Sequence, residues 1–120
     1  TIWEALNLTG LRYEEWTAHK EFDADIPILH MYIEPKDRNS SGNAEELFHE
    51  KLKEVDPFYR DLESMLGIRP MRVTLLKPGT FERFYDMRRE AGFELGARRP
   101  SRMNPTDEDV RDLLNVSAMV

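Results

Sequence analysis

Three arginines, Arg98, Arg99 and Arg102, lie within five residues of one another near the C-terminal end of the chain. They follow a stretch, residues 71–92, that reads as a strand, a tight turn and a helix. A guanidinium group presents a planar pair of N–H donors that matches the oxygens of a phosphate. The spacing therefore predicts a site for an anion such as a phosphate.

The same arginines have a simpler interpretation. The chain is acidic, and arginines in the loop of an acidic protein commonly pair with surface carboxylates or remain in solvent. The residue pattern alone leaves both interpretations open.

The remaining candidates for chemistry are scattered. His19, His30 and His49 do not have the spacing of metal ligands, and no acidic pair accompanies them. We expect His30, on an apolar strand, to be a hydrogen-bonded core histidine. We expect Glu34 to be a carboxylate at a strand end. No metal site is predicted.

The Pro78-Gly79-Thr80 turn offers a second position for an anion. Its main predicted role is geometric, because Gly79 suits the turn and Thr80 suits a helix N-cap. Backbone N–H groups at a helix N-terminus can also bind an anion.

The composition sets outer limits on the function. The chain has 120 residues, a net charge of −6, 40% hydrophobic residues and no cysteine. This charge argues against a general nucleic-acid binder, which needs a broad basic surface. No apolar run reaches the roughly 18–20 residues of a membrane span, and the start does not resemble a signal peptide. We expect a cytoplasmic protein that does not bind membranes.

The chain is predicted to be a single domain covering residues 1–120, because this length supports one modest core. It begins with Thr1 rather than Met, in the middle of an apolar pattern. We therefore expect it to be a piece of a longer protein.

The first third of the chain predicts two strands. Residues 1–10 could form a helical turn or a strand. Residues 13–22 read as an amphipathic strand with Trp16 and Ala18 on one face. Residues 26–34 are apolar on both faces, as in an inner strand.

A helix broken in two is predicted next. Asn43 suits its N-cap, and apolar residues then recur at spacings of three and four. Pro57 should interrupt this helix, with Asp56 capping the second piece and Gly67 ending it.

The last part predicts a strand at 71–77, a helix from Thr80 to Gly92, and a final helix capped by Thr106. The inward residues of the final helix are expected to be Val110, Leu113 and Leu114. These elements predict an α+β fold, with a small, mostly antiparallel sheet of about three strands and helices packed on one face.

Three segments resemble a known family. They are residues 28–34, an aromatic-rich strand ending in Glu; 54–60, a helix break followed by a Tyr; and 71–82, a strand followed by Lys-Pro-Gly-Thr-Phe. In this order, over residues 11–114, the chain is similar to the C-terminal domain of the GH3 family, the acyl-acid amido synthetases named for auxin-responsive proteins.

The basic segment, residues 97–102, departs from the family pattern. The family shows Lys-x-Pro-Arg shortly before the final helix. Counting back from Asp107 without gaps places Arg99 at the Lys position and Arg102 at the Arg position, while Pro100 falls one residue early. Arg99 would bring a planar fork where Lys brings a mobile point charge.

The resemblance implies an ATP-dependent ligase of the adenylate-forming type. Such an enzyme activates a carboxylic acid as an acyl-adenylate and passes the acyl group to an amine or amino acid. The chain would be the lid domain, inert alone, that closes over an N-terminal adenylation domain of the same chain, which binds most of the ATP and Mg. Arg99 and Arg102 would be catalytic, and Arg98, Arg99 and Arg102 would contact the nucleotide.

The residues themselves leave two other classes of function to consider. The chain could be a non-catalytic α+β module that binds a ligand or a protein. An RNA-binding module is disfavoured by the acidic charge and by the lack of a stacking triplet on a strand.

Overall fold

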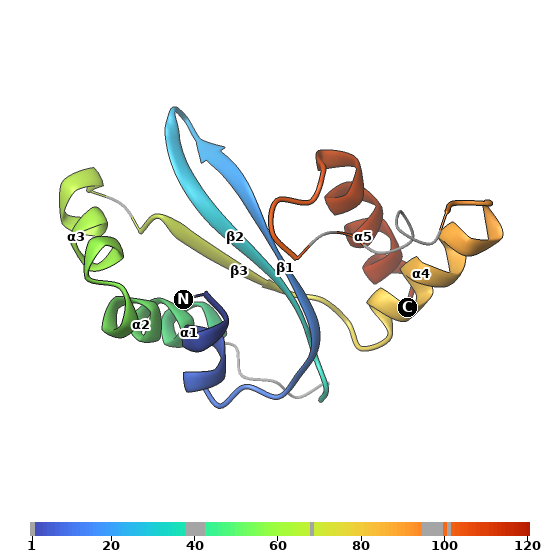
Figure 1. Cartoon of the computed structure of the whole chain (residues 1–120), viewed down its shortest axis with the longest axis horizontal. Coiled ribbons are helices and arrows are strands. Elements are labelled where there is room, and N and C mark those ends of the chain that lie inside the picture. Colours follow the sequence, from blue (N-terminus) through green and yellow to red (C-terminus); the bar gives the residue numbers. More distant parts are fainter. Residues whose placement is uncertain (1, 38–42, 68, 95–99, 101) are drawn as a thin grey trace.

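The protein is described by a computed structural model at residues 2–37, 43–67, 69–94, 100 and 102–120. This part of the chain forms five helices and three strands (Figure 1). Their bounds are α1 Ile2–Leu8, β1 Tyr13–Asp23, β2 Ile26–Pro35, α2 Ala44–Val55, α3 Pro57–Leu66, β3 Met71–Leu75, α4 Thr80–Glu90 and α5 Asp107–Met119. The first ten residues, which the sequence left open, are therefore helical.

The three strands form one sheet with β2 in the centre. β1 and β2 are an antiparallel hairpin, whereas β2 and β3 run parallel. A parallel pair needs a long crossover, and α2 and α3 supply it. The predicted α+β class with three strands is confirmed, and the sheet is mixed because of the β2–β3 pair.

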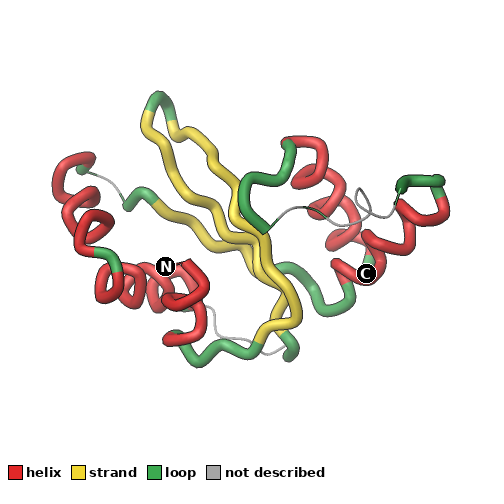
Figure 2. The backbone as a smooth tube through the Cα atoms, viewed as in Figure 1, coloured by secondary structure: helices red, strands yellow, loops and turns green. Residues whose placement is uncertain are grey.

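Alternation along β2 assigns its side chains to the two faces of the sheet. Met31 and Ile33 point into the core formed with α1, α2 and α3. Tyr32 points the other way and packs with Leu76 and Val110. Helices therefore lie on both sides of the sheet (Figure 2), α1–α3 on one face and α4–α5 beyond the other. The sequence pattern predicted one helical layer, and the structure adds a second.

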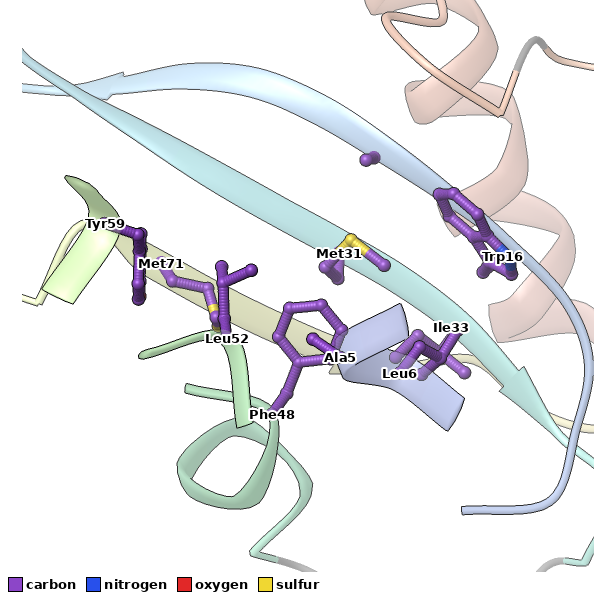
Figure 3. Close-up of a cluster of buried hydrophobic side chains, with 10 residues drawn as sticks. Ala5, Leu6, Trp16, Met31, Ile33, Phe48, Leu52, Tyr59 and Met71 are labelled. Atoms are coloured by element: carbon purple, nitrogen blue, oxygen red, sulfur yellow. The ribbon is translucent and has the colours of Figure 1, made fainter. Parts of the chain in front are cut away.

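The larger core lies between the sheet and the first three helices. Phe48 and Leu52 of α2 and Tyr59 of α3 pack onto it, as the helical apolar stripe predicted (Figure 3). Its buried members are Ala5, Leu6, Trp16, Ala18, Met31, Ile33, Phe48, Leu52, Tyr59 and Met71.

The break between α2 and α3 is confirmed. The Asp56 carboxylate accepts from the N–H groups of Phe58 at 3.0 Å and Tyr59 at 3.2 Å. Pro57 is the first residue of α3, where its missing N–H costs nothing. Gly67 ends α3 with φ 74°, a conformation that favours glycine.

The second layer is the α4–α5 pair. Phe84 of α4 packs with Leu113 and Val116 of α5. The prediction that Leu114 faces inward was wrong, because its side chain is 40% exposed and Val116 fills the next inward position. A residue one place beyond Leu113 is turned by about 100° around the helix axis.

Three local details differ from expectation. Asn43 precedes α2, but its side chain makes no capping hydrogen bond. β3 ends at Leu75 rather than at residue 77. Gly79, not Thr80, is the N-cap residue of α4, and the Thr80 hydroxyl instead donates to the Lys77 carbonyl at 2.6 Å.

Within the described ranges, no helix combines the length and the apolar character needed to cross a bilayer.

Candidate functional site

Of the three arginines of the basic segment, only Arg102 lies in the described part of the chain; Arg98 and Arg99 fall outside it. The backbone at Arg102 is attached to the outer edge of β1. The Arg102 carbonyl accepts from the N–H of Ala18 at 2.7 Å and from the Thr17 hydroxyl at 3.3 Å. Asn104 N–H then donates to the Ala18 carbonyl at 2.9 Å. The chain after Arg102 therefore runs parallel to β1 and forms a short β-bridge with it at Ala18.

The side chain of Arg102 is oriented and still open to solvent. Its Nε donates to Glu15 Oε1 at 2.8 Å, and its guanidinium carbon lies 5.4 Å from the centroid of the Trp16 ring. The Arg102 side chain remains 57% exposed. A guanidinium in this position can still bind an anion from the solvent side.

A cleft of about 470 Å³ adjoins this arginine. It lies between the start of β1, the end of β2 and the start of α4, and Glu15 and Pro100 are among its lining residues. Its charged lining residues are Glu14, Glu15, Glu34, Lys36 and Glu82. Four carboxylates against one ammonium suit a cation better than a phosphate. A phosphate is therefore expected at the exposed edge of Arg102 rather than inside the cleft.

The N-terminus of α4, a second predicted anion position, already holds a carboxylate. Glu34 accepts from the N–H of Phe81 at 2.7 Å and from the N–H of Gly79 at 3.1 Å. Only 4% of Glu34 is exposed. The strand-end glutamate therefore serves as the helix cap that Thr80 was expected to provide. Its sequence position gave no signal for this, because the two elements are far apart along the chain.

A polar network covers the second face of the sheet and was not predicted. Its centre is Glu21, which accepts from the Tyr32 hydroxyl at 2.6 Å, His19 Nδ1 at 2.8 Å and His30 Nδ1 at 2.9 Å. Burial alone would raise the pKa of Glu21, but the hydrogen bonds from Tyr32, His19 and His30 outweigh it and lower the pKa to about 2. Burial and the neighbouring Glu21 raise the pKa of Tyr32 above its ordinary value.

Both histidines of this network have structural partners on their other nitrogen. His30 Nε2 lies 2.6 Å from the Thr74 hydroxyl of β3, and His19 Nε2 lies 2.8 Å from Asp107 at the start of α5. His30 is half-buried rather than in the core, although it is hydrogen-bonded as expected. Each histidine therefore links two elements of the fold.

The described residues contain no group of three or more His, Asp or Glu side chains arranged to hold a metal ion.

Sequence reasoning did not single out Glu15 and Trp16 as neighbours of Arg102. They contact Arg102 from β1, and Glu15 is 87 positions away from it in the sequence. No local pattern marks either residue, because the contact depends on where the chain after the basic segment pairs with β1.

Comparison with known proteins places these features in a family. A model described as the GH3 family C-terminal domain matches residues 2–101. The fold is similar to that of AtGH3.15 acyl acid amido synthetase in complex with 2,4-DB, with a TM-score of 0.62, 15% identity and coverage of 95% of this chain and 22% of that chain. A second structure, of GH3.15 acyl acid amido synthetase, gives a TM-score of 0.63, 15% identity and coverage of 95% and 23%.

None of the curated proteins matches the chain in sequence at a significant level. The chain spans less than a quarter of the length of the two solved proteins. The family model nevertheless covers most of the chain, and its residues include β1, β2, β3 and α4. The chain therefore belongs to the GH3 family and corresponds to its C-terminal domain.

Proposed function

We propose that this chain is the C-terminal domain of a longer acyl-acid amido synthetase. Together with an N-terminal adenylation domain of the same chain, it would activate a carboxylic acid with ATP and transfer the acyl group to an amine or amino acid. Family membership supports this proposal, as does the similarity of the fold to two structures of acyl acid amido synthetases. Alone, the domain is expected to be inert.

The observation that best supports a role for this domain in adenylation is the placement of Arg102. Its backbone is fixed to β1, while its side chain is 57% exposed beside the cleft. Adenylation builds negative charge on the α-phosphate and on the departing pyrophosphate, and a fixed cation stabilises that charge. Arg102, together with Arg99, would supply this cation, and Arg98 would contribute to nucleotide binding.

The donor set suits the phosphates of ATP better than its metal. A planar guanidinium binds phosphate oxygens in pairs. In this proposal, Mg and most contacts to ATP belong to the N-terminal domain, as do the residues that select the acid. This domain adds positive charge when it closes over the nucleotide.

The test is pyrophosphate exchange by the complete synthetase, supplied with ATP and the acid that a screen of carboxylic acids identifies. Arg102→Ala should lower the exchange rate by about a hundred-fold or more, as is common when one charge-stabilising donor is removed. Arg99→Ala should also lower it.

Arg89→Ala is the matched control, because Arg89 is a similarly exposed arginine on α4 that pairs only with Asp86 in the described structure. It should leave exchange unchanged. Exchange at the wild-type rate in Arg102→Ala would refute the proposal for this residue.

A further inference from the structure

We propose that Glu15 is a positioning residue for Arg102. Its carboxylate would fix the direction in which the Arg102 guanidinium faces a phosphate. This inference rests on the proposed function and concerns the same site. Within the described chain, Glu15 is the one carboxylate that forms a salt bridge with Arg102. The two residues come from opposite ends of the sequence.

The Glu15 carboxylate is itself held in place. Its Oε1 accepts both from Arg102 Nε at 2.8 Å and from the backbone N–H of Trp16 at 3.0 Å. The Glu15 side chain is 23% exposed, which is less than half the exposure of Arg102. A carboxylate anchored by its own strand is a fixed acceptor rather than a mobile surface charge.

Trp16 supplies a second constraint. Its side chain belongs to the main core, and only 4% of the residue is exposed. The guanidinium carbon of Arg102 lies 5.4 Å from the ring centroid, which is within the range of a cation–π contact. The ring cannot move without disturbing the core, so it limits the movement of the guanidinium.

The backbone fixes the other end of the side chain. The Arg102 carbonyl accepts from Ala18 N–H at 2.7 Å, and the bridge continues at Met103. The register of β1 against β2 shifts between Tyr13 and Glu15, and the bridge follows three residues later at Ala18. Such irregularities redirect side chains at the end of a strand. The strand that holds the Arg102 backbone therefore also presents the carboxylate that holds its side chain.

The salt bridge determines which edge of the Arg102 guanidinium is left to bind a phosphate. A free arginine can bind a phosphate through Nε and Nη2, or end-on through Nη1 and Nη2. Because Glu15 accepts from Nε, the end-on pair remains for the ligand. A cation fixed in this way needs less reorganisation when charge develops on the phosphate, so its orientation should appear in the rate.

Three substitutions of Glu15 distinguish the effect of where its oxygen lies from the effect of its charge. Glu15→Gln removes the charge but keeps an oxygen that can accept from Arg102 Nε and Trp16 N–H. Glu15→Asp keeps the charge but withdraws the oxygen by one methylene. Glu15→Ala removes both.

In pyrophosphate exchange by the complete synthetase, Glu15→Gln should stay within about threefold of wild type. Glu15→Asp and Glu15→Ala should fall by about ten- to a hundred-fold in kcat, the size expected for a misplaced group. The KM for ATP should change little, because the arginine is still present to attract the nucleotide. A purely electrostatic role would give the opposite order, with Asp close to wild type and Gln impaired.

A double substitution tests whether Glu15 acts through Arg102. Adding Glu15→Asp to Arg102→Ala should lower exchange no further. Glu54→Ala, which removes a 60% exposed carboxylate from α2, is the charge-matched control and should leave exchange unchanged. Melting temperatures measured in parallel should show Glu15→Asp folded under assay conditions.

The inference is overturned if Glu15→Asp exchanges at the wild-type rate while Arg102→Ala is impaired, or if the two substitutions multiply in the double variant. Wild-type exchange in Arg102→Ala would refute the role proposed for Arg102, and a complete synthetase that exchanges no pyrophosphate with any acid would refute the proposed function, so these failures are distinguishable from that of the inference.

Discussion

The carboxylate of Glu34 caps α4 from the end of β2, accepting from the N–H of Phe81 at 2.7 Å and from the N–H of Gly79 at 3.1 Å. The negative charge lies at the positive end of the helix macrodipole and is almost fully buried. This contact attaches the second helical layer to the sheet. A phosphate could use these two amides only by displacing Glu34.

Glu34→Ala should therefore destabilise the fold. It leaves two amides at the start of α4 without their acceptor and removes a favourable charge, for an expected loss of about 2–3 kcal/mol in the free energy of unfolding. Urea unfolding of the 120-residue chain measures this loss. Glu82→Ala is the control, because Glu82 is an exposed carboxylate in the first turn of the same helix and should cost about 0.5 kcal/mol. Equal losses would show that Glu34 contributes only its charge.

The α4–α5 pair depends on Arg88, whose side chain is 10% exposed. Its Nη1 lies 2.7 Å from Asp109 and its Nη2 lies 3.2 Å from Asp112, while its guanidinium carbon is 4.2 Å from the Phe84 ring centroid. Arg88→Met keeps the apolar stem but leaves the Asp109 carboxylate without its cation. The expected loss is about 3 kcal/mol, because removing one partner leaves a mostly buried charge uncompensated.

Arg88→Lys should recover only part of this loss, since an ammonium cannot contact both carboxylates with the geometry of a planar fork. Arg89→Ala is the control on the exposed side of α4, and there the loss should be below about 0.5 kcal/mol. Both are measured by urea unfolding. A loss in Arg88→Met as small as that in Arg89→Ala would contradict the structural role of Arg88.

Local signals in the sequence predicted several helix ends correctly. Asp56 and Pro57 define the start of α3 through contacts within three residues. Thr106 and Asp109 form a reciprocal capping box at the start of α5. These signals work because the interacting atoms belong to neighbouring residues, whatever the rest of the chain does.

The contacts that build the site could not be predicted in this way. Glu34 and Phe81 are 47 positions apart, and Glu15 and Arg102 are 87 positions apart. Both pairs depend on the sheet register and on where the chain returns after α4. One global feature was nevertheless visible, because residues 26–34 are apolar on both faces, and this pattern predicted the inner strand that β2 forms.

The network around Glu21 predicts that the folded state loses stability in strong acid. Because the folded-state pKa of Glu21 is about 2, below the ordinary 4.5, the folded state favours the carboxylate more than the unfolded state does. The stabilisation is fully present above pH 4.5 and is lost as the pH falls towards 2. It amounts to at most about 3 kcal/mol, reduced by solvent screening.

Glu21→Gln should therefore lower stability at pH 7, where the carboxylate accepts from Tyr32, His19 and His30. The difference from wild type should shrink between pH 4.5 and 2.5, as measured by urea unfolding across that range. A difference that stays constant would show that the charge of Glu21 does not contribute. Glu50→Gln, on the exposed surface of α2, provides the matched carboxylate.

The environment of His49 predicts a second dependence of stability on pH, separate from that of Glu21. It is 1% exposed and joins α2 to α3, with Nδ1 2.6 Å from the Tyr59 hydroxyl and Nε2 3.1 Å from Glu63. The neutral ring satisfies both contacts when Tyr59 donates to Nδ1 and Nε2–H donates to Glu63. Burial lowers the pKa of His49 from its ordinary value of 6.5. The unfolded chain therefore takes up a proton at a pH where the folded chain does not.

Stability should consequently be highest above pH 6.5 and should decline as the pH falls below 6.5, well before Glu21 is protonated. His49→Gln should be about 1–3 kcal/mol less stable at pH 7, because at least one buried polar partner loses its hydrogen bond. It should also lose little further stability between pH 6.5 and 5. A decline as steep as in wild type would show that His49 is not the source of this pH dependence.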